Sequence, residues 1–234
     1  MARTAAQMDL DLIPEHLSAF EIYYQELVEW NQRVNLTSIT DREEVQIKHF
    51  LDSLTCLLVM AGHPSRRVLD VGTGPGFPGV PLKIVRPEMQ LTLLESVRKK
   101  TQFLIHLVRQ LDLEHVEVVW GRAENIGHQA AHRECYDVVV ARAVADLPVL
   151  VEYALPFCRL GGIFVAQKGV KASQEAARAQ AALDILGGRL REIKALHLEG
   201  MDDPRHLLVI EKVATTSDRY PRRPGIPDKR PLGQ

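Results

Sequence analysis

Hydrophobic positions in the first 62 residues recur at the spacing of helices. A helix is predicted over 14–31, where four apolar side chains share one face: Leu17, Phe20, Tyr24 and Leu27. A second helix is predicted to begin at Thr40, because Thr40-x-x-Glu43 matches a capping box, and to end at Gly62. We therefore expect residues 1–62 to form an N-terminal helical cap of the same domain as the sequence that follows.

Between residues 63 and 214 the pattern changes to short apolar strands that alternate with helices. Five strands are predicted at 67–71, 91–94, 116–120, 137–141 and 162–166, with helices at 80–85, 99–111, 149–157 and 173–186. Two further strand-like segments, 191–198 and 206–212, are joined by a loop with no room for a helix, which predicts an antiparallel pair. The order indicates an α/β core with a doubly wound, mostly parallel seven-stranded sheet of the Rossmann-like kind.

The last segment, residues 215–234, combines prolines with basic side chains. Its prolines are Pro221, Pro224, Pro227 and Pro231, and its basic residues are Arg219, Arg222, Arg223, Lys229 and Arg230. This composition is typical of a segment that stays extended or disordered until it binds a partner. Positive charge on a flexible segment can follow phosphates, so this tail is the chain's best candidate for contacting a nucleic acid.

The chain as a whole is almost neutral, with a formal net charge of −1 at pH 7. Any binding of nucleic acid must therefore come from local patches. The three cysteines, Cys56, Cys135 and Cys158, are scattered without a C-x-x-C pair, so neither a disulfide framework nor a cysteine zinc site is expected. Because no apolar leader and no long apolar run is visible, the sequence predicts a cytoplasmic protein that does not enter a membrane.

The strongest motif is the glycine loop after the first predicted strand, Asp70-Val71-Gly72-Thr73-Gly74-Pro75-Gly76-Phe77-Pro78-Gly79. Glycines at this place let a ligand approach the backbone closely. The spacing from Gly74 to Gly79 fits a dinucleotide-binding loop, whereas the spacing from Asp70 to Gly76 fits an S-adenosylmethionine-binding loop. Glu95, at the end of the second strand, serves either cofactor because a carboxylate can accept both ribose hydroxyls.

The donors and charges of this loop favour S-adenosylmethionine. A pyrophosphate needs free backbone N–H groups at a helix N-terminus, and Pro75 and Pro78 each remove one. Asp70 would also place a carboxylate beside the phosphates, whereas an acid favours the ammonium and sulfonium groups of S-adenosylmethionine. The loop therefore predicts a methyltransferase, with an NAD-dependent oxidoreductase as the alternative.

At this loop the chain resembles the RsmG family, also called GidB, of bacterial 16S ribosomal RNA guanine-N7 methyltransferases. Further motifs carry the resemblance from about residue 20 to 212: Trp30-Asn31, Asn35-Leu36-Thr37-Ser38, His49-Phe50-Leu51-Asp52-Ser53, Ile84-Val85-Arg86-Pro87-Glu88, Gly121-Arg122-Ala123-Glu124, Ala141-Arg142-Ala143, Lys168-Gly169 and Arg205-His206-Leu207. The resemblance implies methyl transfer from S-adenosylmethionine to N7 of a guanine in the 530 loop of 16S rRNA. It also implies the 16S rRNA or the small ribosomal subunit as the partner.

The spacing of the glycine loop predicts cofactor contacts at Asp70, Gly72, Gly74 and Gly76. The resemblance further implies that residues of the loop, of the end of the second strand and of the turn after the third hold the cofactor: Gly72, Phe77, Glu95, Ser96, Ala123 and Glu124. Arg142, after the fourth strand, would close the pocket on the substrate side, and we expect it nearest the chemistry. Glu95 stands where Asp is common in the family, and it keeps the carboxylate with a longer reach.

The implied acceptor atom suits the side chains that the sequence offers. Guanine N7 has a free lone pair and no proton, so alignment is needed but a general base is not. No Asn/Asp-Pro-Pro-Tyr/Phe motif follows the fourth strand, and no cysteine lies in a Pro-Cys motif. Arg142, a fixed cation with planar donors, could hold the methionine carboxylate or a phosphate, with a surface ion pair as its alternative.

Contacts with RNA are predicted at the cap, beside the fifth strand and in the tail. His49 and Lys168 are the candidates in the first two places, with a helix-surface or satisfied core histidine as an equal alternative for His49. In the tail, the candidates are its five basic residues. Deleting 218–234 is predicted to weaken RNA binding while leaving cofactor affinity intact.

No metal site is predicted. His128 and His132 lie four residues apart near Cys135, but they lack the further ligand that a zinc site needs. We expect a monomer. Two alternatives remain beside the oxidoreductase: a methyltransferase with another RNA or a small-molecule acceptor, and an RNA-binding protein that keeps a vestigial glycine loop.

Overall fold

A seven-stranded sheet forms the centre of the computed structural model, which describes residues 1–233. Its strands are β1 (Arg67–Val71), β2 (Gln90–Glu95), β3 (Val116–Trp120), β4 (Tyr136–Arg142), β5 (Cys158–Lys168), β6 (Gly188–Leu196) and β7 (Arg205–Lys212). They are ordered β3-β2-β1-β4-β5-β7-β6, and only β7 runs antiparallel to its neighbours. The predicted mostly parallel seven-stranded sheet with a C-terminal antiparallel pair is confirmed.

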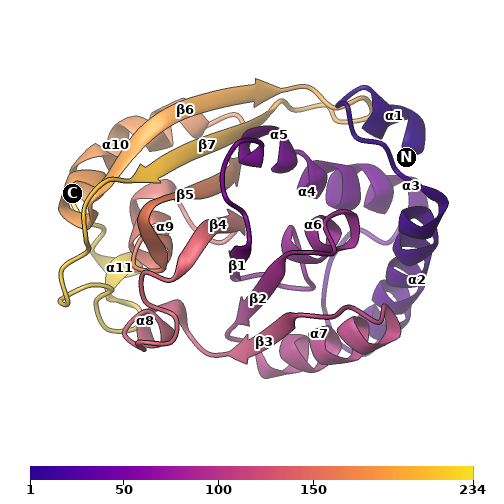
Figure 1. Cartoon of the computed structure of the whole chain (residues 1–234), viewed down its shortest axis with the longest axis horizontal. Helices are drawn as coiled ribbons and strands as arrows, with labels where there is room; N and C mark the ends of the chain where they lie inside the picture. The colour runs from indigo at the N-terminus through magenta and orange to yellow at the C-terminus, as the bar shows by residue number, and fades with distance from the viewer. Residues whose placement is uncertain (234) are drawn as a thin grey trace.

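Helices cover both faces of the sheet (Figure 1). One face carries α2 (Pro14–Asn31), α3 (Arg42–Val45), η1 (Gln46–Leu51), α4 (Asp52–Leu54), α5 (Leu57–Met60), α6 (Gly79–Val85) and α7 (Arg98–Gln110). The other face carries α8 (Ala123–Ile126), α9 (Leu147–Ala154), α10 (Ala172–Leu186) and α11 (Ile226–Lys229), and α1 (Ala2–Ala6) lies beside the β6–β7 loop. Within residues 1–233, none of these helices combines the length and apolar character that crossing a bilayer requires.

Alternating strand residues build two separate cores, one on each face of the sheet. In β4, Val138 and Val140 join the core under α2, α6 and α7, whereas Val139 and Ala141 join the core under α9 and α10. Successive side chains of a strand point to opposite faces, so a sheet covered on both sides needs apolar residues throughout. This burial fixes the carboxyl ends of β1, β2, β4 and β5 at one edge.

The second predicted helix is interrupted, and its cap lies one residue further along than expected. Asp41, not Thr40, caps it, because Asp41 Oδ1 accepts a hydrogen bond from the backbone N–H of Glu44 at 3.0 Å. After one α-helical turn the chain forms a π-helix over Gln46–Leu51 and returns to α-helix at Asp52. The sequence pattern missed the interruption because the apolar stripe continues through it. A π-helical turn is a feature often found at functional sites.

The C-terminal segment, residues 215–233, is folded against the core, which corrects the expected extended or disordered tail. Arg133 donates hydrogen bonds to the carbonyl oxygens of Thr216 and Tyr220, at 2.7 and 2.8 Å. His128 Nε2 lies 2.7 Å from the carbonyl oxygen of Pro221. Side chains of the 128–133 segment therefore satisfy the backbone of a segment that pairs with no strand, and its composition alone did not show this.

Candidate functional site

Two cavities open at the carboxyl edge of the parallel strands. The glycine-loop cavity, about 220 Å³, is lined by residues that include Gly72, Ser96, Ala123, Glu124, Val144, Tyr153 and Asp228. The cap cavity, about 320 Å³, is lined by residues that include Lys48, His49, Asp52, Arg142, Gln167, Lys168 and Arg205. Ala143 lines the cap cavity and Val144 the glycine-loop cavity, so the chain that leaves β4 forms the partition between them.

Gly72 lets this partition approach the glycine loop. Its φ is +66°, in the left-handed region that favours glycine. A Cβ at this position would lie 2.8 Å from Val144 Cγ2, closer than carbon atoms can pack. The predicted cofactor residue Gly72 is therefore required by the close contact between the loop and the segment after β4.

Asp70 supports the glycine loop from below and lines neither cavity. Its Oδ2 accepts hydrogen bonds from Thr73 Oγ1 at 2.6 Å and from the backbone N–H of Gly79 at 2.7 Å. Burial raises the pKa of this carboxyl to about 7. The side chain thus positions the glycine loop, and its predicted contact with a cofactor stays a prediction.

The same contact argues against the dinucleotide alternative. A pyrophosphate would occupy the free N–H groups at the start of α6. The first of these, from Gly79, already binds the Asp70 carboxylate. The site for phosphates is therefore taken by a side chain of the protein.

Glu95 connects the end of β2 to the glycine loop. Its Oε2 accepts the backbone N–H of Gly74 at 2.9 Å, and Oε1 accepts that of Val97 at 2.7 Å. Ser96 Oγ adds a hydrogen bond to Oε1 at 3.5 Å, so about one of the four acceptor positions of the carboxylate remains for a ribose hydroxyl. Ser96 lines the cavity directly, whereas Glu95 does not.

Phe77 holds the helical cap against the loop. Its ring stacks with those of Tyr23 and His49 at centroid distances of 5.2 and 4.6 Å, and Arg142 Cζ lies 4.9 Å from its centroid. A Cβ on Gly76 would meet Tyr23 Oη at 2.6 Å, so this glycine makes room for the stack. Phe77, Gly74 and Gly76, which were predicted to bind the cofactor, do not line the glycine-loop cavity and support its wall instead.

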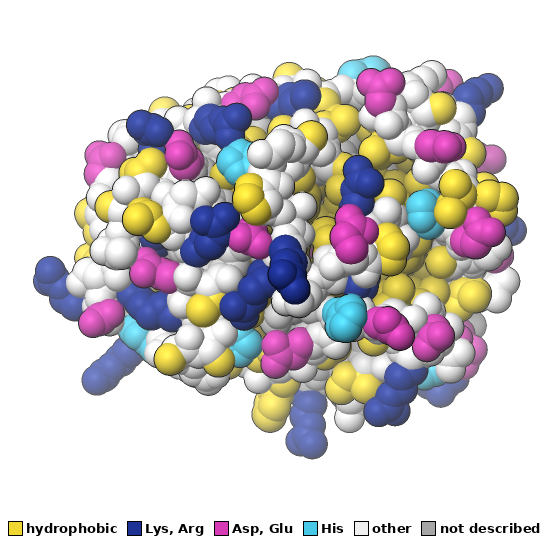
Figure 2. Space-filling view, in the orientation of Figure 1, with side chains coloured by type: hydrophobic (Ala, Val, Ile, Leu, Met, Phe, Trp, Pro, Cys, Tyr) yellow, Lys and Arg dark blue, Asp and Glu magenta, His cyan; other side chains and the backbone are white. Residues whose placement is uncertain are grey.

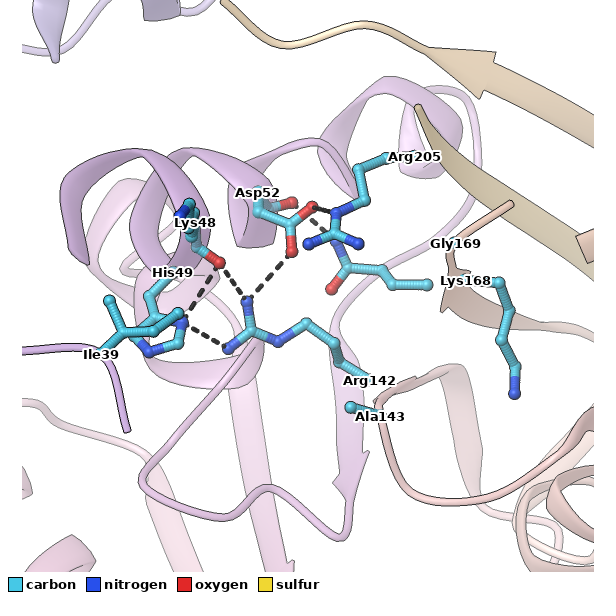
Figure 3. A pocket seen from close by; sticks show the side chains of 10 residues that line it. Ile39, Lys48, His49, Asp52, Arg142, Ala143, Lys168, Gly169 and Arg205 are labelled. Atoms are coloured by element: carbon cyan, nitrogen blue, oxygen red, sulfur yellow. Dashed lines mark hydrogen bonds and ion pairs between the residues drawn. The ribbon is translucent and has the colours of Figure 1, made fainter. Parts of the chain in front are cut away.

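Arg142 is the centre of the cap cavity (Figure 3). Its Nη1 donates to the carbonyl oxygen of Lys48 at 2.9 Å and to Asp52 Oδ2 at 3.1 Å. Its Nη2 lies 3.3 Å from His49 Nδ1. Asp52 is almost completely buried, and Arg205 Nε lies 3.4 Å from its Oδ1. Two guanidinium groups therefore share one carboxylate, which leaves an excess of positive charge at the cavity.

The predicted RNA residues His49 and Lys168 both line this cavity but differ in what they offer. Burial, and then the charge of Arg142, lower the pKa of His49 to about 4, so its ring is neutral at pH 7. Lys168 points away from the network (Figure 3) and forms an ion pair of 2.7 Å with Glu175. Its ammonium group is therefore already neutralised by the protein.

The predicted RNA residues of the tail are dispersed. Arg222 is bound by the buried carboxylate of Glu152, with Nη2 at 2.6 Å from Oε2, so its side chain faces the protein. The remaining four are exposed: Arg219, Arg223, Lys229 and Arg230. In the view of Figure 2, basic side chains gather over the half of the molecule that carries α8, α9 and α11, with acidic ones between them.

Several cavity residues were not assigned a role from the sequence. Asp52 and Arg205 stand in motifs that carry the family resemblance, and these motifs were the available signal. Val144, Tyr153 and Asp228 line the glycine-loop cavity without any sequence signal, since each belongs to a segment whose path depends on tertiary packing.

A family model described as rRNA small subunit methyltransferase G matches residues 16–208. The chain belongs to this family. The RsmG (GidB) resemblance of the sequence is thereby confirmed. Curated relatives agree: the ribosomal RNA small subunit methyltransferase G of Pelotomaculum thermopropionicum is 50% identical over 97% of this chain and 95% of its own length. That of Roseiflexus castenholzii is 50% identical over 99% of this chain and 98% of its own length.

Solved structures of low sequence identity share the fold. Precorrin-6y C5,15-methyltransferase from Geobacter metallireducens has a TM-score of 0.52 at 14% identity, covering 68% of this chain and 87% of its own. M. jannaschii TYW2 in complex with AdoMet has a TM-score of 0.53 at 13% identity, and the match covers 69% of this chain and 77% of its own. The cyclase SpnF matches as well, with a TM-score of 0.54 at 16% identity, and the match covers 70% of this chain and 81% of its own. The likeness therefore shows the fold alone.

Proposed function

We propose that this protein transfers a methyl group from S-adenosylmethionine to N7 of a guanine in the 530 loop of 16S rRNA. The observation that carries the proposal is the pair of cavities on either side of the short segment after β4. The name of the curated relatives supports ribosomal RNA of the small subunit as substrate. The choice of guanine N7 rests on the resemblance of the sequence motifs.

The glycine-loop cavity suits S-adenosylmethionine. Gly72 lines the cavity on the side proposed for the methionine part, and the remaining acceptor capacity of Glu95 suits the ribose. Ala123 and Glu124, at the start of α8, would border the adenine. When bound there, the cofactor supplies an electrophilic methyl group.

The cap cavity suits a nucleobase on a phosphate backbone. Arg142 and Arg205 together outweigh the charge of Asp52, which favours a negatively charged nucleic acid. Gln167 Oε1 is buried and makes no hydrogen bond within residues 1–233, and Asp52 Oδ1 has only its ion pair with Arg205. Both are acceptors, and the Watson–Crick edge of guanine presents N–H donors. A guanine would therefore suit the acceptors at this cavity.

The chemistry needs alignment more than proton transfer. As a bond forms between guanine N7 and the methyl carbon, the carbon–sulfur bond breaks, and no proton has to be removed. His49 is neutral and Asp52 is paired with two arginines, so neither is needed as a base. Arg142 fixes the wall against which the base would lie, and its planar donors can hold a polar group of the substrate.

The direct test uses small ribosomal subunits that lack this methyl group. The purified protein is incubated with them and with labelled S-adenosylmethionine, and the labelled nucleoside is identified and mapped by mass spectrometry. We expect 7-methylguanosine at one site in the 530 loop. Label in another nucleoside or at another place would reject the acceptor, and no label, despite binding of S-adenosylmethionine, would reject the ribosomal substrate.

A further inference from the structure

The C-terminal segment supplies part of the wall of the glycine-loop cavity. Asp228, in α11, lines this cavity together with Tyr153 of α9 and Glu124 of α8. The backbone N–H of Gly225 donates a hydrogen bond to Glu124 Oε1 at 3.1 Å, which leaves Oε2 as an acceptor for a ligand. The segment thus provides one acidic residue of the cavity and orients another.

Both carboxylates line the same small cavity as Tyr153. Burial, and then the negative charges of Glu124 and Asp228, raise the pKa of Tyr153 to about 12. The edge of the cavity at Tyr153 is therefore acidic. Ionised carboxylates accept hydrogen bonds and donate none, so this edge selects a ligand group that carries N–H or O–H donors.

A buried ion pair fixes the position of the segment. Arg222 donates to Glu152 from Nε at 2.9 and 3.1 Å and from Nη2 at 2.6 Å, and its backbone N–H donates a further hydrogen bond at 2.7 Å. Glu152 is completely buried and directly precedes Tyr153 in α9. Separating a buried ion pair leaves a charge without its partner, which costs free energy, so Glu152 keeps Arg222 in place. Three residues later, Gly225 reaches Glu124.

We propose that the C-terminal segment is part of the adenosine site, where Asp228 and the Gly225-oriented Glu124 recognise the 6-amino group of adenine and Arg222 is the positioning residue that holds the segment in place. This inference rests on the proposed use of S-adenosylmethionine. It gives the segment a role in the cofactor site that the composition of the tail does not suggest. The 6-amino group is the donor that this acidic edge would select.

The first test removes the carboxylate of Asp228, which is exposed, so that the fold is spared. Binding of S-adenosylhomocysteine to the full-length chain is measured by calorimetry for Asp228→Ala and for the control Asp218→Ala. Asp218 lies in the same segment, and its side chain is fully exposed. We expect Asp228→Ala to weaken binding about tenfold and Asp218→Ala to change it by less than about twofold.

A purine analogue of S-adenosylhomocysteine that lacks the 6-amino group shows whether the effect is one of recognition. The wild-type protein should prefer the amino compound, and Asp228→Ala should lose most of that preference. A merely structural role of Asp228 would weaken both ligands equally and leave their ratio unchanged.

The second test releases the segment by Arg222→Gln, with Arg189→Gln as the control. Arg189 also pairs with a glutamate, Glu211, but on the exposed surface of β6 and β7. We expect Arg222→Gln to lower the affinity for S-adenosylhomocysteine about tenfold or more and to reduce the preference for the 6-amino compound. Arg189→Gln should leave both the affinity and the preference unchanged. Thermal unfolding without ligand identifies the share of the effect that comes from lost stability.

The outcomes separate this inference from the proposed function. If the wild-type protein binds neither S-adenosylhomocysteine nor S-adenosylmethionine, the proposed cofactor is wrong and the inference falls with it. If the wild-type protein binds and Asp228→Ala and Arg222→Gln match their controls in affinity and in preference, the inference alone is overturned.

Discussion

At the scale of single residues, the partition between the cavities depends on an unusual backbone conformation. Ala143 has a φ of +54°, which is uncommon for a residue other than glycine. On one side of it Arg142 lines the cap cavity, and on the other Val144 lines the glycine-loop cavity. Strained backbone persists only where its surroundings hold it. Here the hydrogen bonds of Arg142 and the packing of Val144 against Gly72 do so.

Gly72 and Gly74 form a matched pair that tests this packing. Both have left-handed backbones, with φ of +66° and +61°, but only a Cβ at 72 would strike Val144. Gly74→Ala should cost about 1 kcal/mol of unfolding free energy from backbone strain alone. Gly72→Ala should cost about 2 kcal/mol more because Val144 must move. Urea unfolding measures both, and equal losses would mean that Val144 does not press on the loop.

Because the pKa of Asp70 is raised, its contribution to the unfolding free energy should change with pH in the opposite direction to that of a paired surface carboxylate. Between its ordinary pKa of 3.8 and its folded value of about 7, the folded protein holds a proton that the unfolded chain has released. Stability contributed by Asp70 therefore falls as pH rises through this window, by about 4 kcal/mol at most.

Asp70→Asn removes this dependence while keeping an oxygen acceptor for Thr73 and Gly79. The unfolding free energy of the variant minus that of the wild type should rise from pH 4.5 to pH 7.5. His49, whose lowered pKa gives stability the opposite slope, is present in both proteins and cancels. A difference that stays constant with pH would show that Asp70 is not a buried acid.

At the scale of elements, the strands and long helices could be predicted because their apolar periodicity reflects burial directly. The helix predicted over 14–31 is α2, and that predicted over 173–186 is α10 with one added residue. Short elements could not be found this way. The four-residue helices α8 and α11 exist because tertiary contacts hold them, such as the hydrogen bond between Gly225 and Glu124.

The corrected helix cap can be tested by two neighbouring alanine substitutions. Asp41→Ala removes the acceptor for the N–H of Glu44 and should cost about 1 kcal/mol of unfolding free energy. Thr40→Ala removes an exposed side chain without a capping bond and should change it by less than about 0.5 kcal/mol. Thermal or urea unfolding gives both values. A larger loss of unfolding free energy for Thr40→Ala than for Asp41→Ala would show that Thr40 caps the helix, as the capping box in the sequence suggests.

At the scale of the whole molecule, one carboxylate joins the helical cap to the sheet. Asp52 of the cap receives Arg142 from the end of β4 and Arg205 from the start of β7. Gln167 of β5 donates to the backbone oxygen of Asp52 at 2.6 Å. The sequence motifs placed these residues in the family pattern, but no local rule brings together positions that are 90 or more residues apart. Their function as a junction appears only in the folded chain.

Asp52→Asn should loosen this junction. Two arginine charges would lose their partner, and we expect about 2 kcal/mol less unfolding free energy together with a fall in methyl transfer. Asp146→Asn is the control, because Asp146 also pairs with an arginine, Arg178, where both side chains are about half exposed. That variant should lose less than about 0.5 kcal/mol. Equal stability of the two variants would show that Asp52 does not join the cap to the sheet.

The central claim is that cofactor and acceptor occupy separate cavities that meet at the segment after β4. A crystal structure of the protein with S-adenosylhomocysteine tests it most directly. We expect adenine beside Glu124 and Asp228, ribose at Glu95, and the sulfur at the partition of Ala143 and Val144, facing the cavity of Arg142. A ligand bound elsewhere, or one whose sulfur faces away from the cap cavity, would contradict it.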